Sequence, residues 1–125
     1  LLAQMTPTQR HRLLAHAPLE PFTPQTLVDL TALEDEIKRV KRQGFALDNE
    51  EFLPGLLCIA VLVPAAAGRS NLCVAAQAPI MRMTPDKALQ MLPALQRAAQ
   101  ALSSIEADAA PISRVHSLHL GDTHE

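Results

Sequence analysis

The sequence predicts an α+β fold, in which an antiparallel sheet is flanked by helices. Two continuous apolar runs, Leu56 to Val63 and residues 71–77, are typical of strands and can pair as a hairpin. Helical apolar spacing precedes and follows them, which gives the order helix, helix, strand, hairpin, helix. The 125 residues are 48% apolar and 19% charged, which fits one small globular domain, and we expect this domain to comprise residues 1–106.

The first predicted helix begins after Thr6. Thr6 can serve as its N-cap, a proline follows at the first helical position, and Gln9 stands where a capping box needs it, so we expect a helix to about His16. Residues 17–29 contain three prolines and predict an irregular connection. The chain opens on the apolar run Leu1-Leu2-Ala3 without an initiator Met, which suggests a fragment that begins inside an element.

The second predicted helix is the clearest in the chain. Thr31 and Glu34 have capping-box spacing, and Gly44 stands where a C-terminal cap belongs. Apolar residues recur between them at helical spacing, and oppositely charged residues stand four apart: Leu33, Ile37 and Val40, with the pairs Glu34–Lys38 and Asp35–Arg39. These charges indicate a solvated helix face rather than a binding patch.

The predicted sheet begins with a short strand from Phe45 to Asp48, followed by an acidic stretch and a Pro54-Gly55 turn into the hairpin. Side chains alternate between the two faces of a strand. One face of the second strand therefore carries Leu56, Cys58, Ala60 and Leu62, and one face of the third carries Cys73, Ala75 and Gln77. The two cysteines read as buried thiols; a disulfide is open if the two strands are neighbours, although a cytosolic protein would normally keep it reduced.

The last predicted helix starts at Thr84-Pro85-Asp86 and carries an apolar stripe that ends near Leu102. Pro93 predicts a kink there, or a break just before it. The periodicity ends at Glu106, and we expect residues 107–125 to form a flexible C-terminal tail. Histidines and an aspartate in this tail could gather a metal, but the spacing of His116, His119, Asp122 and His124 does not fix a geometry, so no metal site is expected.

The charge pattern limits the partners of this segment. The net charge is −2, and Lys and Arg form no basic stripe, so the segment is not expected to touch DNA itself. No apolar run reaches the ~20 residues of a membrane span, and no secretory signal is visible, so neither membrane insertion nor export is expected and a cytoplasmic location follows.

Three motifs resemble the effector domain of the IclR family of bacterial transcription regulators. Residues 43–51 (QGFALDNEE) are similar to the family's R-G-Y-A-x-D-D-E-E segment. Residues 51–60 (EFLPGLLCIA) are similar to its E-x-x-P-G-V-R-C-I-A segment, and residues 78–86, which contain AP and RMTPD, to G-P-x-x-R-x-T-x-E. The resemblance runs from Leu1, within a G-K-A-L-L-A-like motif, to about Ile105, and its order and spacing make it fairly specific.

The resemblance implies a GAF-like sheet that binds a small organic metabolite as effector, in a complete protein that forms homo-oligomers. It also implies that the first part of the effector domain is missing, and that DNA is bound only through an N-terminal winged helix-turn-helix domain absent from this chain. Neither catalysis nor a cofactor is expected. By motif, the ligand-binding residues are Asp48, Leu56, Cys58, Ala75 and Gln77.

The sequence departs from the family at three positions near this site. Ala75 and Gln77 replace residues that are commonly Ser, and Leu57 replaces a common Arg. Ala75 cannot donate a hydrogen bond and a cation is removed, so a larger or more neutral effector than a small carboxylate is expected.

Structural explanations for the same residues stay open. Cys58 can be a small core residue, Asp48 a turn cap, and Gln77 a partner of backbone at a sheet end, while Leu56 and Ala75 can be core. Cys58 as a nucleophile would need a His as base, and none occurs between His16 and His116. The alternative function is a stand-alone ligand-sensing or protein-interaction module without a role in DNA binding.

Overall fold

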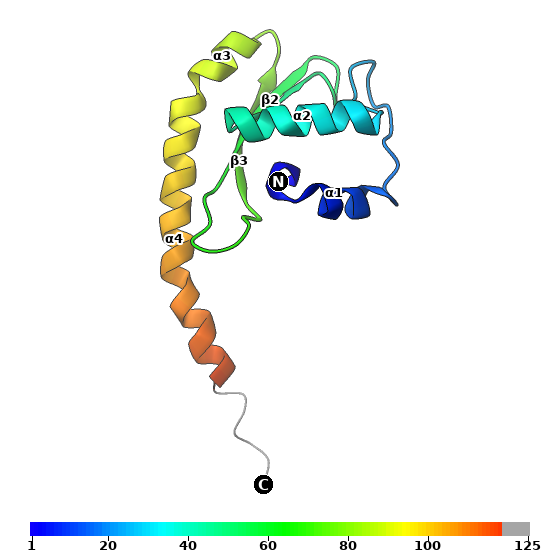
Figure 1. Cartoon of the computed structure of the whole chain (residues 1–125). Coiled ribbons are helices and arrows are strands. Elements are labelled where there is room, and N and C mark those ends of the chain that lie inside the picture. The colour runs from blue at the N-terminus through cyan, green and yellow to red at the C-terminus, as the bar shows by residue number, and fades with distance from the viewer. Residues whose placement is uncertain (119–125) are drawn as a thin grey trace.

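The computed structural model describes the backbone of residues 1–118 and the side chains of residues 1–108. Its elements are the 3-10 helix η1 (Leu2–Gln4), α1 (Pro7–Leu14), α2 (Leu30–Gln43), β1 (Ala46–Asn49), β2 (Leu56–Leu62), β3 (Cys73–Pro79), α3 (Pro85–Gln90) and α4 (Leu92–Leu118). In Figure 1 the sheet lies between α4 and the N-terminal part of the chain, which comprises η1, α1 and α2. This arrangement is the predicted α+β class.

The sheet has three antiparallel strands in the order β1-β2-β3. The expected hairpin is confirmed, with Ile59 opposite Ala76, and the short first strand pairs with the other edge of β2. Exposure alternates along β2 and β3, so the two faces of the sheet have different surroundings.

One face of the sheet packs on α3 and α4 and forms the hydrophobic core. The core residues come from β2 and the segment after it, from the start of α3 and from the first turns of α4: Leu57, Ile59, Val61, Val63, Met83, Ala88, Leu95 and Ala99. Leu57, Ile59 and Val63 have no exposed surface. The even-numbered β2 residues therefore face away from this core, as the period of two predicts.

The N-terminal helices are fixed to each other by an ion pair whose arginine is buried. The capping box of α1 forms as predicted, with the Gln9 N–H donating to Thr6 Oγ1 at 3.2 Å. Arg10, only 4% exposed, donates to both carboxylate oxygens of Glu34 on α2 at 3.0 and 2.8 Å and to the Met5 carbonyl. The hydrogen bonds from Arg10 hold the pKa of the Glu34 carboxyl below its usual range.

Helix α2 begins earlier than expected, and its predicted capping box is wrong. Asp29 is the N-cap and accepts hydrogen bonds from the Thr31 and Ala32 N–H groups, while Glu34 is engaged with Arg10. A carboxylate two residues upstream thus takes the place expected for the Thr31 hydroxyl. Nor do the described residues show the two predicted charge pairs; besides the Arg10 pair, they show Glu36 with Arg39 at 3.3 Å. The C-terminal cap is as expected, with Gly44 at φ 83°.

The C-terminal helices show the expected break, but the last one runs further than expected. Thr84 caps α3, which ends at Gln90, and α4 begins at Leu92 with Pro93 in its first turn. The backbone is helical to Leu118, so the helix passes the boundary at residue 106 at which periodicity ends. Of the predicted tail, residues 119–125 lie outside the described residues, as do the side chains of the histidines proposed there.

Cys58 and Cys73 lie on neighbouring strands but form no disulfide. Cys58 is opposite Gln77, and Cys73 is opposite Leu62, so the register separates the two thiols by four positions along β2. Cys73 is exposed, which corrects the expectation that both thiols are buried. Within the described residues, no helix is long and apolar enough to cross a membrane.

Candidate functional site

The face of the sheet that turns away from α3 and α4 carries all five residues predicted to bind ligand. Asp48, Cys58 and Gln77 are consecutive cross-strand partners on β1, β2 and β3 and form one row. Ala75 lies in the next row, opposite Ala60, and Leu56 lies opposite Pro79. Cys58, Ala75 and Gln77 therefore share one face of the sheet, as parity predicted.

A hollow of about 350 Å³ opens on this face where β1 and β2 meet the connection between α1 and α2. We call it the acidic hollow. Its floor is sheet, and its walls come from the α1–α2 connection and the β1–β2 loop: Phe22, Thr26, Ala46, Leu47, Asp48, Glu51, Phe52, Cys58 and Ala60. Its volume is in the range of pockets that hold small metabolites.

The acidic motif builds the loop that borders this hollow. The Glu51 N–H donates to Asp48 Oδ1 at 2.8 Å, and the Asn49 N–H donates to Glu51 Oε2 at 3.1 Å. The Glu50 carboxylate accepts from the Gly55 N–H at 2.8 Å, and Glu50 itself has φ 60°, in the left-handed region. Asp48 therefore caps the turn through Oδ1, which is the structural role left open by the sequence. Its other oxygen, Oδ2, accepts no hydrogen bond within the described residues.

The opposite wall was not found from the sequence. Thr23, which is 6% exposed, donates to the Glu50 carbonyl at 2.5 Å, and Thr26 donates to the Glu51 carbonyl. These hydrogen bonds fix the proline-rich connection to the β1–β2 loop. Two of the three phenylalanines in the chain then meet over the hollow, with the rings of Phe22 and Phe52 5.6 Å apart. The T-x-x-T pattern of Thr23 and Thr26, in a connection predicted to be irregular, is the sequence signal that could have indicated this wall.

The hollow carries two carboxyl side chains, and its surroundings favour the protonated thiol of Cys58. Burial raises the pKa of the Glu51 carboxyl above its usual range, and the neighbouring Asp48 charge adds to this shift. Burial and the Asp48 charge also raise the pKa of the Cys58 thiol, so a thiolate nucleophile is disfavoured there. Neither Lys nor Arg is among the described residues that line the hollow. The site can accept hydrogen bonds at carboxylates and pack an apolar surface, but it offers no cation to an anion.

The predicted residues differ in how closely they approach the hollow. Asp48 and Cys58 line it, whereas Leu56, Ala75 and Gln77 share the face without lining it. Gln77 is exposed, and its side chain makes no hydrogen bond within the described residues, so it does not pair with backbone there. It borders a separate hollow of about 470 Å³ between β3 and α3, which Arg82 and Lys87 also line.

Leu57 lies on the opposite face of the sheet. Its side chain is fully buried in the core, one position away from Cys58 and therefore on the other side of β2. The inference that Leu57 changes the charge near the ligand site is therefore wrong, because a residue at this position does not face the hollow. The acidic character of the hollow depends on Asp48 and Glu51.

In the described part of the chain, no three His, Cys, Asp or Glu side chains are grouped so as to hold a metal ion.

Comparison with known proteins places this geometry in a family. The family described as bacterial transcriptional regulator IclR C-terminal matches residues 1–104. The transcriptional regulator BhcR of Paracoccus denitrificans is 37% identical over 103 residues, which are 82% of this chain and 37% of BhcR.

Solved structures of IclR regulators share the fold. The C-terminal domain of Escherichia coli KdgR superposes with a TM-score of 0.76 at 27% identity, over 82% of this chain and 63% of that domain. The inducer-binding domain of Acinetobacter PobR, solved with 3-hydroxybenzoic acid, gives 0.77 at 24% identity, over 82% of this chain and 59% of that one.

The chain spans 37 to 39% of the length of the two curated relatives BhcR and SauR. The family match covers most of this chain, including both strands that line the acidic hollow and the loop that borders it. The chain therefore belongs to the IclR family of bacterial transcriptional regulators and matches its C-terminal domain.

Proposed function

We propose that this chain is the effector-binding part of an IclR-family regulator and that the acidic hollow holds the effector. The observation that carries the proposal is the convergence of Asp48 and Cys58 on one hollow whose wall is fixed by Thr23 and Thr26. Because the hollow has carboxylates and no cation, its effector is a metabolite that presents hydrogen-bond donors.

Effector binding controls DNA binding through a domain outside these 125 residues. A ligand that binds one arrangement of subunits better than another shifts their populations, and this shift changes the affinity of the regulator for DNA. Such a protein acts as a homo-oligomer in the bacterial cytoplasm and catalyses no reaction. The relatives named above are transcriptional regulators, which supports this assignment.

Two variants at one position test the site. A thermal-shift screen of the 125-residue chain with donor-bearing metabolites should identify ligands, because a ligand that binds only the folded state raises the melting temperature. Cys58→Leu adds volume inside the acidic hollow and should abolish the shift, whereas Cys58→Ala, which leaves the hollow open, should retain it.

One outcome of the experiment with these two variants would contradict the proposal. If Cys58→Leu melts cooperatively and still gives the full ligand shift, the ligand binds elsewhere and the assignment of the hollow is wrong.

A further inference from the structure

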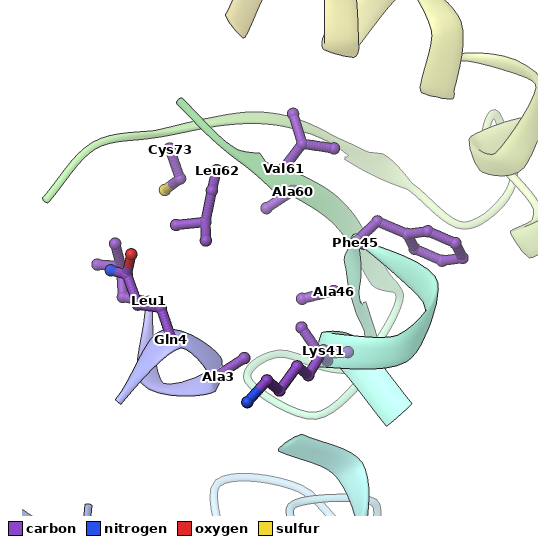
Figure 2. A pocket seen from close by; sticks show the side chains of 12 residues that line it. Leu1, Ala3, Gln4, Lys41, Phe45, Ala46, Ala60, Val61, Leu62 and Cys73 are labelled. Carbon is purple, nitrogen blue, oxygen red and sulfur yellow. The ribbon is translucent and has the colours of Figure 1, made fainter. Parts of the chain in front are cut away.

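A second hollow lies on the same face of the sheet, beyond the one assigned to the effector. It measures about 280 Å³ and is bounded by η1, the C-terminal end of α2, the start of β1 and the facing ends of β2 and β3. Figure 2 shows Leu62 and Cys73 on one side of it and Leu1 and Ala3 on another. We call it the apolar hollow.

The two hollows are adjacent and share two lining residues. Ala46 and Ala60 are cross-strand partners, and both residues line the acidic and the apolar hollow. Their methyl groups are small, so no bulky side chain divides the face at this row. Along β2 the face runs from Cys58 past Ala60 to Leu62, which is about 14 Å at the usual rise of a strand.

The apolar hollow offers little to a polar group. Of its two side chains with long polar ends, Gln4 is already engaged, since its amide accepts from the Ser70 N–H at 2.9 Å and donates to the Ser70 carbonyl. These bonds also fix η1 to the β2–β3 loop and so hold the wall in place. The Lys41 side chain runs along the rim near Ala3 in Figure 2, and the remaining lining is aliphatic, aromatic, thiol or glycine.

We propose that the effector has two parts: a hydrogen-bond-donating head at Asp48 and Glu51, and an apolar tail that passes Ala60 into the apolar hollow. Charge complementarity sets the orientation of the effector between the two hollows, because the acidic hollow favours an amine or another donor and disfavours a carboxylate. The volume of the apolar hollow limits the size of the tail. A cavity of about 150 Å³ can hold benzene, so the 280 Å³ of this hollow accommodates a chain of about five to eight carbons or a substituted ring. The inference rests on the proposed function, and it specifies the class of effector.

The test measures binding of two amines of different length to the 125-residue chain by NMR titration. Burying one methylene tightens binding by up to about fourfold. n-Octylamine should therefore bind at least about 100-fold more tightly than n-propylamine, which ends within the acidic hollow. n-Octanoate, which has the same number of carbons but an anionic head, should bind at least about tenfold more weakly than n-octylamine, a larger difference than its one missing tail methylene explains.

Matched variants locate the tail. Leu62→Gln makes the lining of the apolar hollow polar and should weaken n-octylamine binding by about tenfold while leaving n-propylamine unchanged. Leu72→Gln is the same substitution at an exposed neighbouring position outside both hollows and should change neither. If Leu62→Gln does not melt cooperatively, Cys73→Phe, which fills the same hollow from an exposed position, should give the same selective loss.

The possible results separate this inference from the proposed function. If n-octylamine binds no more tightly than n-propylamine, fails to bind, or weakens equally in both Gln variants, the two-part effector is wrong. The assignment of the acidic hollow as the effector site would remain valid if Cys58→Leu still abolished binding of other metabolites. If chain length matters but Cys58→Leu has no effect on any ligand, the apolar hollow binds alone and the acidic hollow does not hold the head. Equal binding of n-octanoate and n-octylamine would overturn the assignment of a donor head.

Discussion

Replacement of Asp48 by Asn separates its role in the turn from its role in ligand binding. The Asn side chain keeps an oxygen for the Glu51 N–H, which now lies 2.8 Å from Asp48 Oδ1, and loses only the charge. The loss weakens one hydrogen bond but also removes the repulsion that raises the pKa of Glu51. These effects oppose each other, so the free energy of unfolding should change by less than about 0.5 kcal/mol.

Ligand binding should be more sensitive to the same substitution. A hydrogen bond to a charged group contributes about 1.5–3 kcal/mol, against about 0.5–1.5 kcal/mol for a neutral one. The difference of about 1–1.5 kcal/mol corresponds to a Kd about five- to thirteenfold weaker for a ligand that donates to Asp48. Calorimetry with the strongest ligand from the thermal-shift screen measures it, and chemical denaturation measures stability in parallel.

Two further variants make the result decisive. Asp35→Asn is the same change on the exposed face of α2 and should alter neither quantity. Asp48→Ala removes the turn cap as well and should cost about 1 kcal/mol of stability. If Asp48→Asn leaves the Kd unchanged, or lowers stability as much as Asp48→Ala, Asp48 is a turn cap alone and the reasoning is refuted.

Three other predictions follow from the two faces of the sheet. Leu57→Ala should lower the free energy of unfolding by about 3–5 kcal/mol because its side chain is fully buried, whereas Leu56→Ala should cost less than half as much; equal losses in denaturant melts would contradict the assignment of faces. Glu51→Gln should raise the melting temperature at pH 7, because burial raises the folded-state pKa of Glu51 and its ionisation therefore opposes folding. This gain should shrink as the pH falls below the usual Glu range, where Glu51 is protonated in both the folded and the unfolded state. A difference in melting temperature that does not depend on pH would argue against this explanation. Ser at both Ala75 and Gln77 adds hydroxyl donors on the sheet face but outside the acidic hollow, so the affinity for pyruvate should stay unchanged in calorimetry; tighter binding would show that these two positions select the effector.

The sheet could be predicted because its information is local. Alternating exposure follows directly from strand geometry, so the placement of Cys58 and Leu62 on one face needed only the strand limits. The start of α2 could not be fixed in this way, since Asp29 and Thr31 are both acceptable caps and Glu34 is drawn away by Arg10, 24 residues earlier. A long-range ion pair leaves no periodic trace in the sequence.

The candidate site could be predicted only where motif residues line it. Asp48 and Cys58 were found through their motifs, but the hollow also depends on Phe22 and Phe52, which are brought together by threonine hydrogen bonds across 27 and 25 residues. The apolar hollow was not anticipated, because its walls come from five segments whose aliphatic residues look like ordinary core. Such a cavity depends on the relative position of packed elements, and sequence spacing does not encode that position.

The alanine methyl groups of the sheet report which of its two faces binds the effector. Ala46, Ala60 and Ala75 lie on the face that carries the hollows, whereas Ala76 and Ala78 pack against the core on the other face. In a methyl-labelled sample of the chain titrated with a ligand from the screen, the Ala46 and Ala60 resonances should shift most, with smaller changes at Ala75 and none at Ala76 or Ala78. Shifts confined to the core-side methyls, or spread equally over both faces, would contradict this prediction.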